Sequence, residues 1–221
     1  MPVPKPSDLA AYIDHTLLKP DCRQAEVERL CAEAVTHHFA AVCVLPCWLR
    51  LAAQKTAVSA VAAGTVIGFP LGAAVSGVKA QEARQAIADG ATELDMVLNI
   101  SALKSGQDDW VALDIRGVVE VARPAGALVK VILETCLLTD EEKNRACRIA
   151  EAAGADFVKT STGFSYGGAT VEDVRLMRAA VGSTVQVKAS GGIRTFAQAV
   201  AMLQAGATRL GTSSGVALVT G

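Results

Sequence analysis

The chain has 221 residues, of which 51% are hydrophobic, enough to bury the single large core of an α/β barrel. Its 21 Lys and Arg residues nearly balance its 22 Asp and Glu residues, so no net positive field favours nucleic acid or an anionic membrane surface. We therefore predict one domain over residues 1–221 that binds any anionic ligand through local groups.

Neither a targeting segment nor a metal-binding pattern is recognisable. The first 20 residues lack the apolar run of a signal peptide, and no later segment has the roughly 18 consecutive apolar residues of a membrane span. A cytoplasmic location is the default expectation. The six cysteines form no C-x-x-C pair and have no His partner at zinc spacing, so we expect free thiols and no metal site.

Short β-branched runs alternate with longer segments rich in Ala, Glu, Arg and Leu along the whole chain. This alternation is typical of βα units around a parallel sheet. Thr139 and Glu142 have the spacing of a capping box, which predicts a helix to about residue 153. The predicted strands are residues 12–16, 41–45, 65–69, 93–98, 128–134, 156–160, 185–189 and 209–212. Eight such units favour a closed (β/α)8 TIM barrel over an open sheet.

Three predicted helices end in the same way, with a glycine followed by an alanine and then a strand. Glycine supplies the left-handed stop of a helix, and these stops are Gly90, Gly154 and Gly206. Five residues beyond them lie Asp95, Lys159 and Gly211. These three residues therefore fall toward the C-terminal ends of strands, where such barrels carry their catalytic groups.

Two lysines lie within predicted strands. Strand alternation places Lys159 on the same face as Phe157, and Lys188 on the same face as Gln186. Burial opposes the charge of an ammonium group, so it lowers the pKa of a lysine. If Lys188 stays protonated, its charge lowers the pKa of Lys159 further and leaves a neutral amine that can attack a carbonyl, with Asp95 to carry protons. The alternative is that one lysine reaches solvent and the other pairs with Asp95.

The loops after the last two predicted strands, residues 190–194 and 211–215, are short and rich in hydrogen-bond donors. Glycine N–H groups, serine hydroxyls and a helix N-terminus can surround a phosphate, and barrels often bind phosphate in these two loops. Each loop taken singly is more often just a turn, but the occurrence of both at the two expected places favours a phosphate site. The candidate substrate-binding residues are Thr162, Gly163, Gly191, Gly192, Gly211, Ser213 and Ser214.

The remaining polar residues give weaker indications. His37 and His38 are expected to end a helix, where a cation is favourable. Asp14, at the end of the first predicted strand, is a candidate contact for a substrate hydroxyl, although it could equally bond loop backbone. Cys43 and Cys47 are expected to fill core space, because no base is identifiable near either.

Six segments together resemble the deoxyribose-phosphate aldolase family. They occur in the family's order between Asp14 and about Gly215, at residues 14–20, 68–72, 93–97, 130–135, 159–164 and 188–194. The resemblance implies reversible cleavage of 2-deoxy-D-ribose 5-phosphate into D-glyceraldehyde 3-phosphate and acetaldehyde, without a metal or other cofactor. It also implies that Lys159 forms a Schiff base, that Lys188 tunes it, and that Asp95 relays protons through water. Family habit implies a homodimer or homotetramer.

The chain departs from the family's pattern at two places. Many members carry a C-terminal tail with a tyrosine proposed to assist proton transfer, whereas the tyrosines here are Tyr12 and Tyr166. We expect either a tail that this sequence leaves out or another route for that proton. Some members have a lysine after the glycine that matches Gly163, where this chain has Phe164, so the phosphate would lose an ionic contact that Arg194 could partly replace.

Three other functions remain open at this point. Another Schiff-base barrel enzyme, such as a transaldolase-like or different 2-deoxy-sugar aldolase, would share Lys159 and the two loops predicted to bind phosphate, residues 190–194 and 211–215. A barrel that only binds a phosphosugar would use the lysines for their charge. A phosphosugar isomerase would need a positioned carboxylate base, and the paired lysines argue against it.

Overall fold

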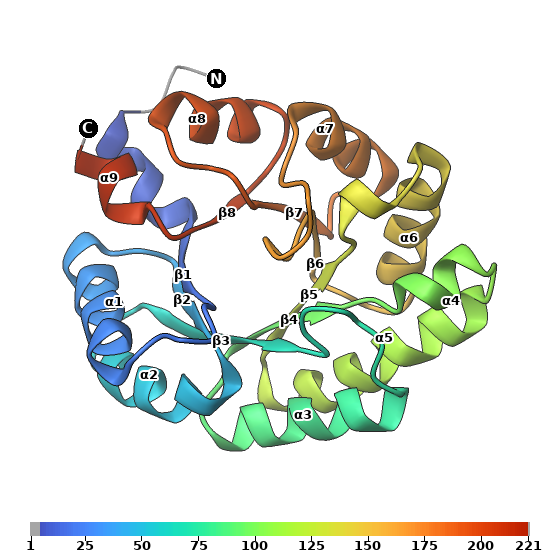
Figure 1. Cartoon of the computed structure of the whole chain (residues 1–221), viewed down its shortest axis with the longest axis horizontal. Coiled ribbons are helices and arrows are strands. Elements are labelled where there is room, and N and C mark those ends of the chain that lie inside the picture. The colour runs from blue at the N-terminus through green and yellow to red at the C-terminus, as the bar shows by residue number, and fades with distance from the viewer. Residues whose placement is uncertain (1–4, 221) are drawn as a thin grey trace.

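A computed structural model describes residues 5–220 of the chain, and within them the strands close into a parallel barrel in the order β1 to β8 (Figure 1). The predicted TIM-barrel fold is confirmed. The outermost boundaries of the predicted domain, residues 1 and 221, lie outside the described residues. The strands are β1 (Ile13–Leu17), β2 (Ala41–Val44), β3 (Ala62–Ile67), β4 (Glu93–Val97), β5 (Leu128–Ile132), β6 (Phe157–Lys159), β7 (Gln186–Ser190) and β8 (Arg209–Thr212).

Helices surround the barrel and join its strands (Figure 1). They are α1 (Gln24–His37), α2 (Leu49–Thr56), α3 (Ser76–Ala88), α4 (Ile100–Lys104), α5 (Asp108–Ala122), α6 (Asp140–Ala152), α7 (Val171–Ala180), α8 (Phe196–Gln204) and α9 (Gly215–Thr220). Four 3₁₀ helices complete the described part: η1 (Pro6–Tyr12), η2 (Pro46–Trp48), η3 (Arg123–Ala125) and η4 (Thr135–Leu137). None of the helices within residues 5–220 is long and apolar enough to cross a membrane.

The strand predictions hold to within one or two residues, with β3 as the main exception. This strand begins at Ala62, three residues before the predicted start. The sequence did not predict this start because the Ala-Ala-Gly opening carries no β-branched side chain. The predicted strand 128–134 was also too long. It ends at Ile132, since Glu134 adopts the left-handed conformation with φ 57°.

The predicted helix ends are confirmed. Gly90, Gly154 and Gly206 all have positive φ, and His38 caps α1 in the left-handed conformation. The capping box at the start of α6 is formed, with the Glu142 N–H donating to Thr139 Oγ1 at 3.3 Å and the Thr139 N–H donating to Glu142 Oε2 at 2.9 Å. These stops fix where each chain segment enters the barrel.

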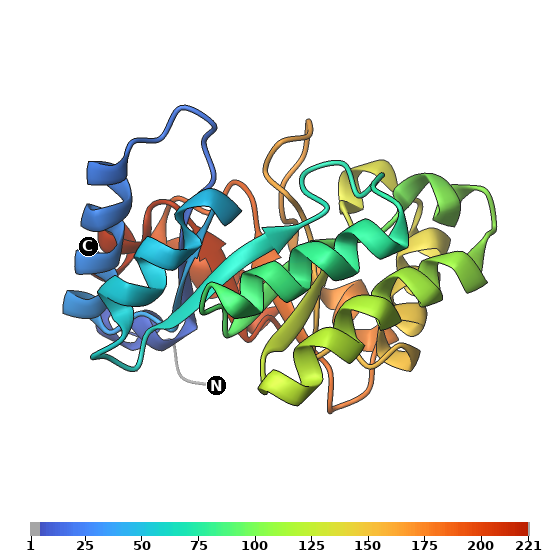
Figure 2. The ribbon, with the colours of Figure 1, turned by 90° about the horizontal axis from the view of Figure 1, so that it is seen from below.

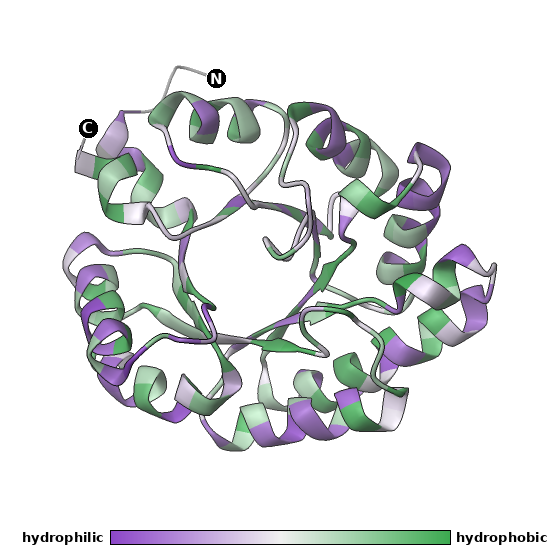
Figure 3. Cartoon of the chain, in the orientation of Figure 1, coloured by the Kyte–Doolittle hydropathy of each residue, from purple (hydrophilic) through white to green (hydrophobic). Residues whose placement is uncertain are grey.

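The two faces of the strands have opposite chemistry. Residues such as Leu94, Met96 and Val131 are buried in the hydrophobic core between barrel and helices. Alternate positions on the same strands carry Glu93, Asp95 and other charged groups that are equally buried. Figure 3 accordingly shows hydrophilic and hydrophobic residues mixed along the strands, while the helices carry most of their hydrophilic residues outward. The barrel interior is therefore polar, and the loops after β1, β3 and β6 rise from one rim of it (Figure 2).

Candidate active site

A cavity of about 440 Å³ opens at the rim formed by the C-terminal ends of the strands. Seven of the eleven predicted site residues line it: Lys159, Thr162, Gly163, Gly191, Gly192, Gly211 and Ser213. Two cations, Lys19 and Arg194, also belong to its lining. The cavity thus joins the amine predicted to be reactive to the loops predicted to bind phosphate.

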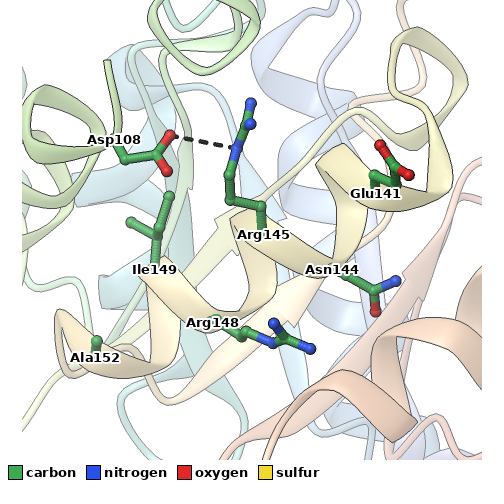
Figure 4. Close-up of a pocket in the computed structure, with 7 residues that line it drawn as sticks. All are labelled: Asp108, Glu141, Asn144, Arg145, Arg148, Ile149 and Ala152. Carbon is green, nitrogen blue, oxygen red and sulfur yellow. Dashed lines mark ion pairs between the residues drawn. The ribbon is translucent and has the colours of Figure 1, made fainter. Parts of the chain in front are cut away.

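A larger hollow, of about 600 Å³, lies elsewhere on the outer surface, along α6 and the start of α5 (Figure 4). Its side chains include an ion pair between Arg145 Nε and Asp108 Oδ1 at 3.3 Å. This hollow lies on the helical exterior and contains none of the predicted site residues. We therefore place the chemistry in the smaller cavity at the barrel rim.

Lys159 lies at the end of β6 with its side chain only 4% exposed. Its Nζ donates to Asp95 Oδ2 at 2.7 Å, and Lys188 Nζ donates to the same oxygen at 2.7 Å. Parallel pairing of β6 with β7 sets Lys159 and Lys188 side by side. The structure therefore brings the three predicted catalytic residues together.

The charges of this group favour different protonation states for the two lysines. Burial lowers the pKa of Lys159, and although Asp95 opposes this effect, the charge of Lys188 adds to it. Burial also acts against the charge of Lys188, but the carboxylates of Asp14 and Asp95 outweigh it and raise its pKa. Lys188 is thus the cation of the pair, and Lys159 is the amine more easily deprotonated.

Asp14, predicted as a contact for a substrate hydroxyl, does not line the cavity. It is fully buried, accepts from Lys188 Nζ, and accepts from Arg209 Nη1 at 2.7 Å. Ser214 also lies outside this cavity, in a neighbouring hollow behind β1, where its N–H donates to Thr212 Oγ1. Direct substrate contact by either residue stays a prediction.

Lys130 is a member of this cluster that the sequence analysis left without a role. Its Nζ, in the middle of β5, donates to Asp95 Oδ1 at 2.8 Å and to Glu93 Oε2 at 2.6 Å. The Val-Lys-Val sequence around it carries the signal that singled out Lys159, a charged residue inside an apolar strand. Arg209 and Glu93, whose side chains meet at 3.1 Å, were also missed.

The loops after β6, β7 and β8 present free backbone donors to the cavity. Within residues 5–220, the N–H groups of Gly163, Gly191, Gly192 and Ser213 have no hydrogen-bond partner in the chain. Gly191 adopts φ 90° and lies close to Gly168. A Cβ atom added to Gly191 would lie 3.0 Å from the Gly168 Cα. Glycine is therefore required here for the loop to pass close to its neighbour. Such N–H groups suit an anion with several oxygens.

Glu134 accepts hydrogen bonds from the loop after β6. Its carboxylate is buried and accepts from Thr162 N–H at 3.3 Å and from the Thr162 hydroxyl. Thr162 Oγ1 in turn accepts from the Phe164 N–H at 3.0 Å, so both ends of the Thr162–Phe164 turn are tied to one carboxylate. Glu134 makes these contacts from a left-handed backbone conformation, which is unusual for a residue other than glycine.

The cysteines divide between core and surface. Cys43 is buried inside the barrel, and burial raises the pKa of its thiol to about 11, as expected for a residue that fills core space. Cys47 is exposed, so its prediction as core was wrong. It follows a proline in the short η2 helix, where the chain has already left the barrel wall. Within residues 5–220 no group of His, Cys, Asp and Glu is arranged to hold a metal ion.

Comparison with known proteins identifies the family. Residues 9–220 match the family described as DeoC/LacD family aldolase. The chain belongs to this family. It is 60% identical to the deoxyribose-phosphate aldolase of Shouchella clausii over 97% of this chain and 96% of the relative, and 59% identical to that of Bacillus subtilis over 96% and 95%. A tetrameric deoxyribose phosphate aldolase from Aeropyrum pernix superposes with a TM-score of 0.92 at 37% identity, over 98% of this chain and 91% of that one.

Proposed function

We propose that this aldolase cleaves 2-deoxy-D-ribose 5-phosphate reversibly into D-glyceraldehyde 3-phosphate and acetaldehyde through a Schiff base on Lys159. The observation that carries the proposal is the placement of the Lys159 amine. It is buried, opens on a cavity lined by the loops predicted to bind phosphate, and has the cation Lys188 as its neighbour on the barrel wall. A neutral amine in such a place is a nucleophile for an aldehyde.

The first half of the reaction forms and uses an iminium. The Lys159 amine adds to C1 of the open-chain sugar, and loss of water gives the iminium. A base removes the proton of the C3 hydroxyl, the C2–C3 bond breaks, and its electron pair forms an enamine with the iminium carbon. Glyceraldehyde 3-phosphate leaves. The iminium accepts these electrons more readily than the original carbonyl would.

The second half returns the enzyme to its starting state. A proton adds to C2 of the enamine, water adds to the resulting iminium, and acetaldehyde leaves with Lys159 again a free amine. Asp95 is the group we assign to proton transfer through water, because its Oδ2 lies 2.7 Å from Lys159 Nζ. Lys188 keeps its charge throughout and disfavours protonation of Lys159 between turnovers.

Phosphate binding would position the sugar. Gly163, Gly191, Gly192 and Ser213 supply N–H donors, and the start of α8, capped by Thr195, follows the loop that contains Gly191 and Gly192. Phe164 stands where some family members have a lysine, and it packs against Phe69 with ring centroids 5.2 Å apart. Lys19 and Arg194 in the cavity lining can provide the positive charge instead. Binding energy from this remote group orients C1 against Lys159.

Product identification tests the proposal and separates its competitors. The chain is incubated with 2-deoxyribose 5-phosphate, and the products are identified by mass spectrometry and by coupled reduction of each aldehyde. We expect equal amounts of acetaldehyde and glyceraldehyde 3-phosphate. Other fragments would favour a different Schiff-base aldolase, an isomeric pentose phosphate would favour an isomerase, and unchanged substrate would favour a barrel that only binds.

We also propose a homo-oligomer, a homodimer or homotetramer, in the cytoplasm. Supporting this, the adjacent helices α3 and α5 expose the large apolar side chains of Val78, Trp110 and Leu113. Apolar surface of this kind is often covered by another subunit. Sedimentation of the parent chain and of Trp110→Glu tests the oligomer. We expect the parent to have the mass of a dimer or tetramer, and Trp110→Glu, which places a charge in the subunit interface, to have a lower mass. A monomeric mass for the parent would refute the oligomer.

A further inference from the structure

Six charged side chains inside the barrel form a closed ring of ion pairs in which acids and bases alternate. The contacts between successive members are 2.8, 2.6, 3.1, 2.7 and 2.7 Å, apart from the short contact of Lys188 with Asp14. In order around the ring, the members are Asp95, Lys130, Glu93, Arg209, Asp14 and Lys188. Each side chain thus contacts at least two partners of opposite charge, and Lys130 Nζ also lies 3.7 Å from Asp14 Oδ2 across the ring.

The ring is electrically balanced without Lys159. It holds three carboxylates and three cations, and its side chains are buried, with Arg209 the most exposed at 14%. Among the ring members, Lys159 makes an ion pair with Asp95 alone, and Asp95 already has Lys130 and Lys188 as partners. A proton on Lys159 would therefore add one uncompensated charge to a buried site, which is costly.

Glu93 and Arg209 lie away from the cavity, on the opposite side of the ring from Lys159. They come at the start of β4 and of β8, and neither lines the cavity. The Arg209 guanidinium carbon lies 5.5 Å from the ring centroid of Phe157, two residues before Lys159 on β6. Neither residue can touch a substrate held between Lys159 and the phosphate loops, so any effect on the reaction must pass through the ring.

We propose that the charge balance of this ring keeps Lys159 unprotonated, and that Glu93 and Arg209 are positioning residues that act on Lys159 through Asp95, Lys130, Asp14 and Lys188. This inference rests on the proposed function of Lys159 as the Schiff-base lysine. It assigns a role in the chemistry to two residues at the closed end of the barrel. Removing one ring cation leaves a carboxylate that Lys159 must neutralise, and removing one ring acid has the opposite effect.

The groups that face Lys159 from the surrounding strands are accounted for by this ring, apart from Cys43 on β2. Asp95 on β4 and Lys188 on β7 act on it directly. Burial raises the pKa of the Cys43 thiol to about 11, so this group is neutral in the working range. The remaining charges come from Asp14 on β1, Glu93 on β4, Lys130 on β5 and Arg209 on β8, while β3 carries no charged residue.

The test compares Glu93→Gln, Arg209→Gln and the double variant. The rate of borohydride-trapped imine formation with acetaldehyde is measured against pH, and the adduct is mapped to Lys159 by peptide mass spectrometry. We expect the midpoint of this profile to rise by about one pH unit in Arg209→Gln and to fall by a similar amount in Glu93→Gln. In the double variant, where balance is restored, the midpoint should return close to that of the parent. Arg209→Lys should keep the parent midpoint because it keeps the charge.

Asp114→Asn is the matched control. Asp114 is a buried carboxylate paired with Lys79 between α3 and α5, outside the barrel, so its loss should lower stability without moving the midpoint. Equal midpoints in all variants, or shifts in one direction for both single variants, would overturn the inference. If Arg209→Gln or Glu93→Gln does not fold, Lys130→Met or Asp14→Asn removes the same charge at another place in the ring and must give the same shift. Absence of an adduct in the parent would refute the proposed function instead.

Discussion

Lys159 and Lys188 donate to one and the same oxygen, Oδ2 of Asp95, each at 2.7 Å. Their Nζ atoms can therefore be separated by no more than twice that distance. Two ammonium groups so close in a buried site repel each other strongly. Protonation of Lys188 is favoured over protonation of Lys159, because Asp14 also accepts a hydrogen bond from Lys188. The pKa of Lys188 is raised and that of Lys159 is lowered, so Lys159 is the amine of the pair that loses its proton more easily.

Replacing Lys159 should abolish turnover. Lys159→Ala removes the nucleophile, and Lys159→Arg replaces it with a guanidinium that cannot form an imine at neutral pH. Steady-state assays with 2-deoxyribose 5-phosphate should give no activity above background for either variant. Circular dichroism is the control for folding, and substantial turnover by a folded variant would refute the assignment of Lys159.

Replacing Lys188 should move the reaction to higher pH. Lys188→Leu removes the neighbouring positive charge and leaves Asp95 more fully paired with Lys159, so both changes raise the pKa of Lys159. The ascending limb of the kcat/KM profile against pH should shift upward, and activity at pH 7 should fall. An ascending limb at the parent's pH in the variant would contradict the tuning role.

Gly211 gives Lys188 its space. A Cβ at this position would lie 2.9 Å from Ser190 Cβ and 3.1 Å from Lys188 Cε, so Gly211→Ala should displace the Lys188 amine and lower kcat about tenfold or more. Gly117→Ala on α5 is the matched control, since its Cβ would meet its nearest neighbour at 3.9 Å. Equal kcat values for the two variants would contradict the close contact with Lys188.

Glu134 should affect binding of the phosphate more than the chemistry. Glu134→Gln weakens the hold on the turn around Gly163 and should raise KM for 2-deoxyribose 5-phosphate about tenfold, equivalent to about 1.4 kcal/mol. The kcat/KM for unphosphorylated 2-deoxyribose should change little. Glu141→Gln on the exposed start of α6 serves as the control. A similar loss with both substrates would mean that Glu134 acts on the barrel as a whole.

The buried carboxylates should make the fold sensitive to acid. Burial raises the pKa of Asp14, but Lys188, Lys130 and Arg209 together lower it from 3.8 to about 2. A carboxylate with a lowered folded-state pKa stabilises the fold above its unfolded pKa, and this stability is lost as pH falls through the folded value. The difference corresponds to about 2 kcal/mol for Asp14, lost between about pH 4 and pH 2.

Urea unfolding at a series of pH values measures this loss. The parent's free energy of unfolding should fall toward pH 2 more steeply than that of Asp14→Asn, whose neutral side chain has no such proton to take up. Asp21→Asn, on the exposed turn after β1, is the control and should follow the parent. Parallel curves for the parent and Asp14→Asn would contradict the contribution of Asp14.

The sequence predicted most of the barrel and the centre of the site, for identifiable physical reasons. Strand alternation and the repeated glycine stops are local features, and they sufficed to place Asp95, Lys159 and Lys188 on strands, now seen to be β4, β6 and β7. The ring through Glu93 and Arg209 could not be predicted, because it depends on side chains meeting across the closed interior between β4 and β8. The start of β3 was missed since small residues carry little strand signal, yet they are accommodated there by the barrel around them.

The central claim is that Lys159 forms the imine. Its most direct test is to incubate the chain with 2-deoxyribose 5-phosphate or acetaldehyde and sodium borohydride, and to map the reduced adduct by intact and peptide mass spectrometry. The account predicts a single adduct on the peptide containing Lys159, absent in Lys159→Arg. No adduct, or adducts only on scattered surface lysines, would contradict it.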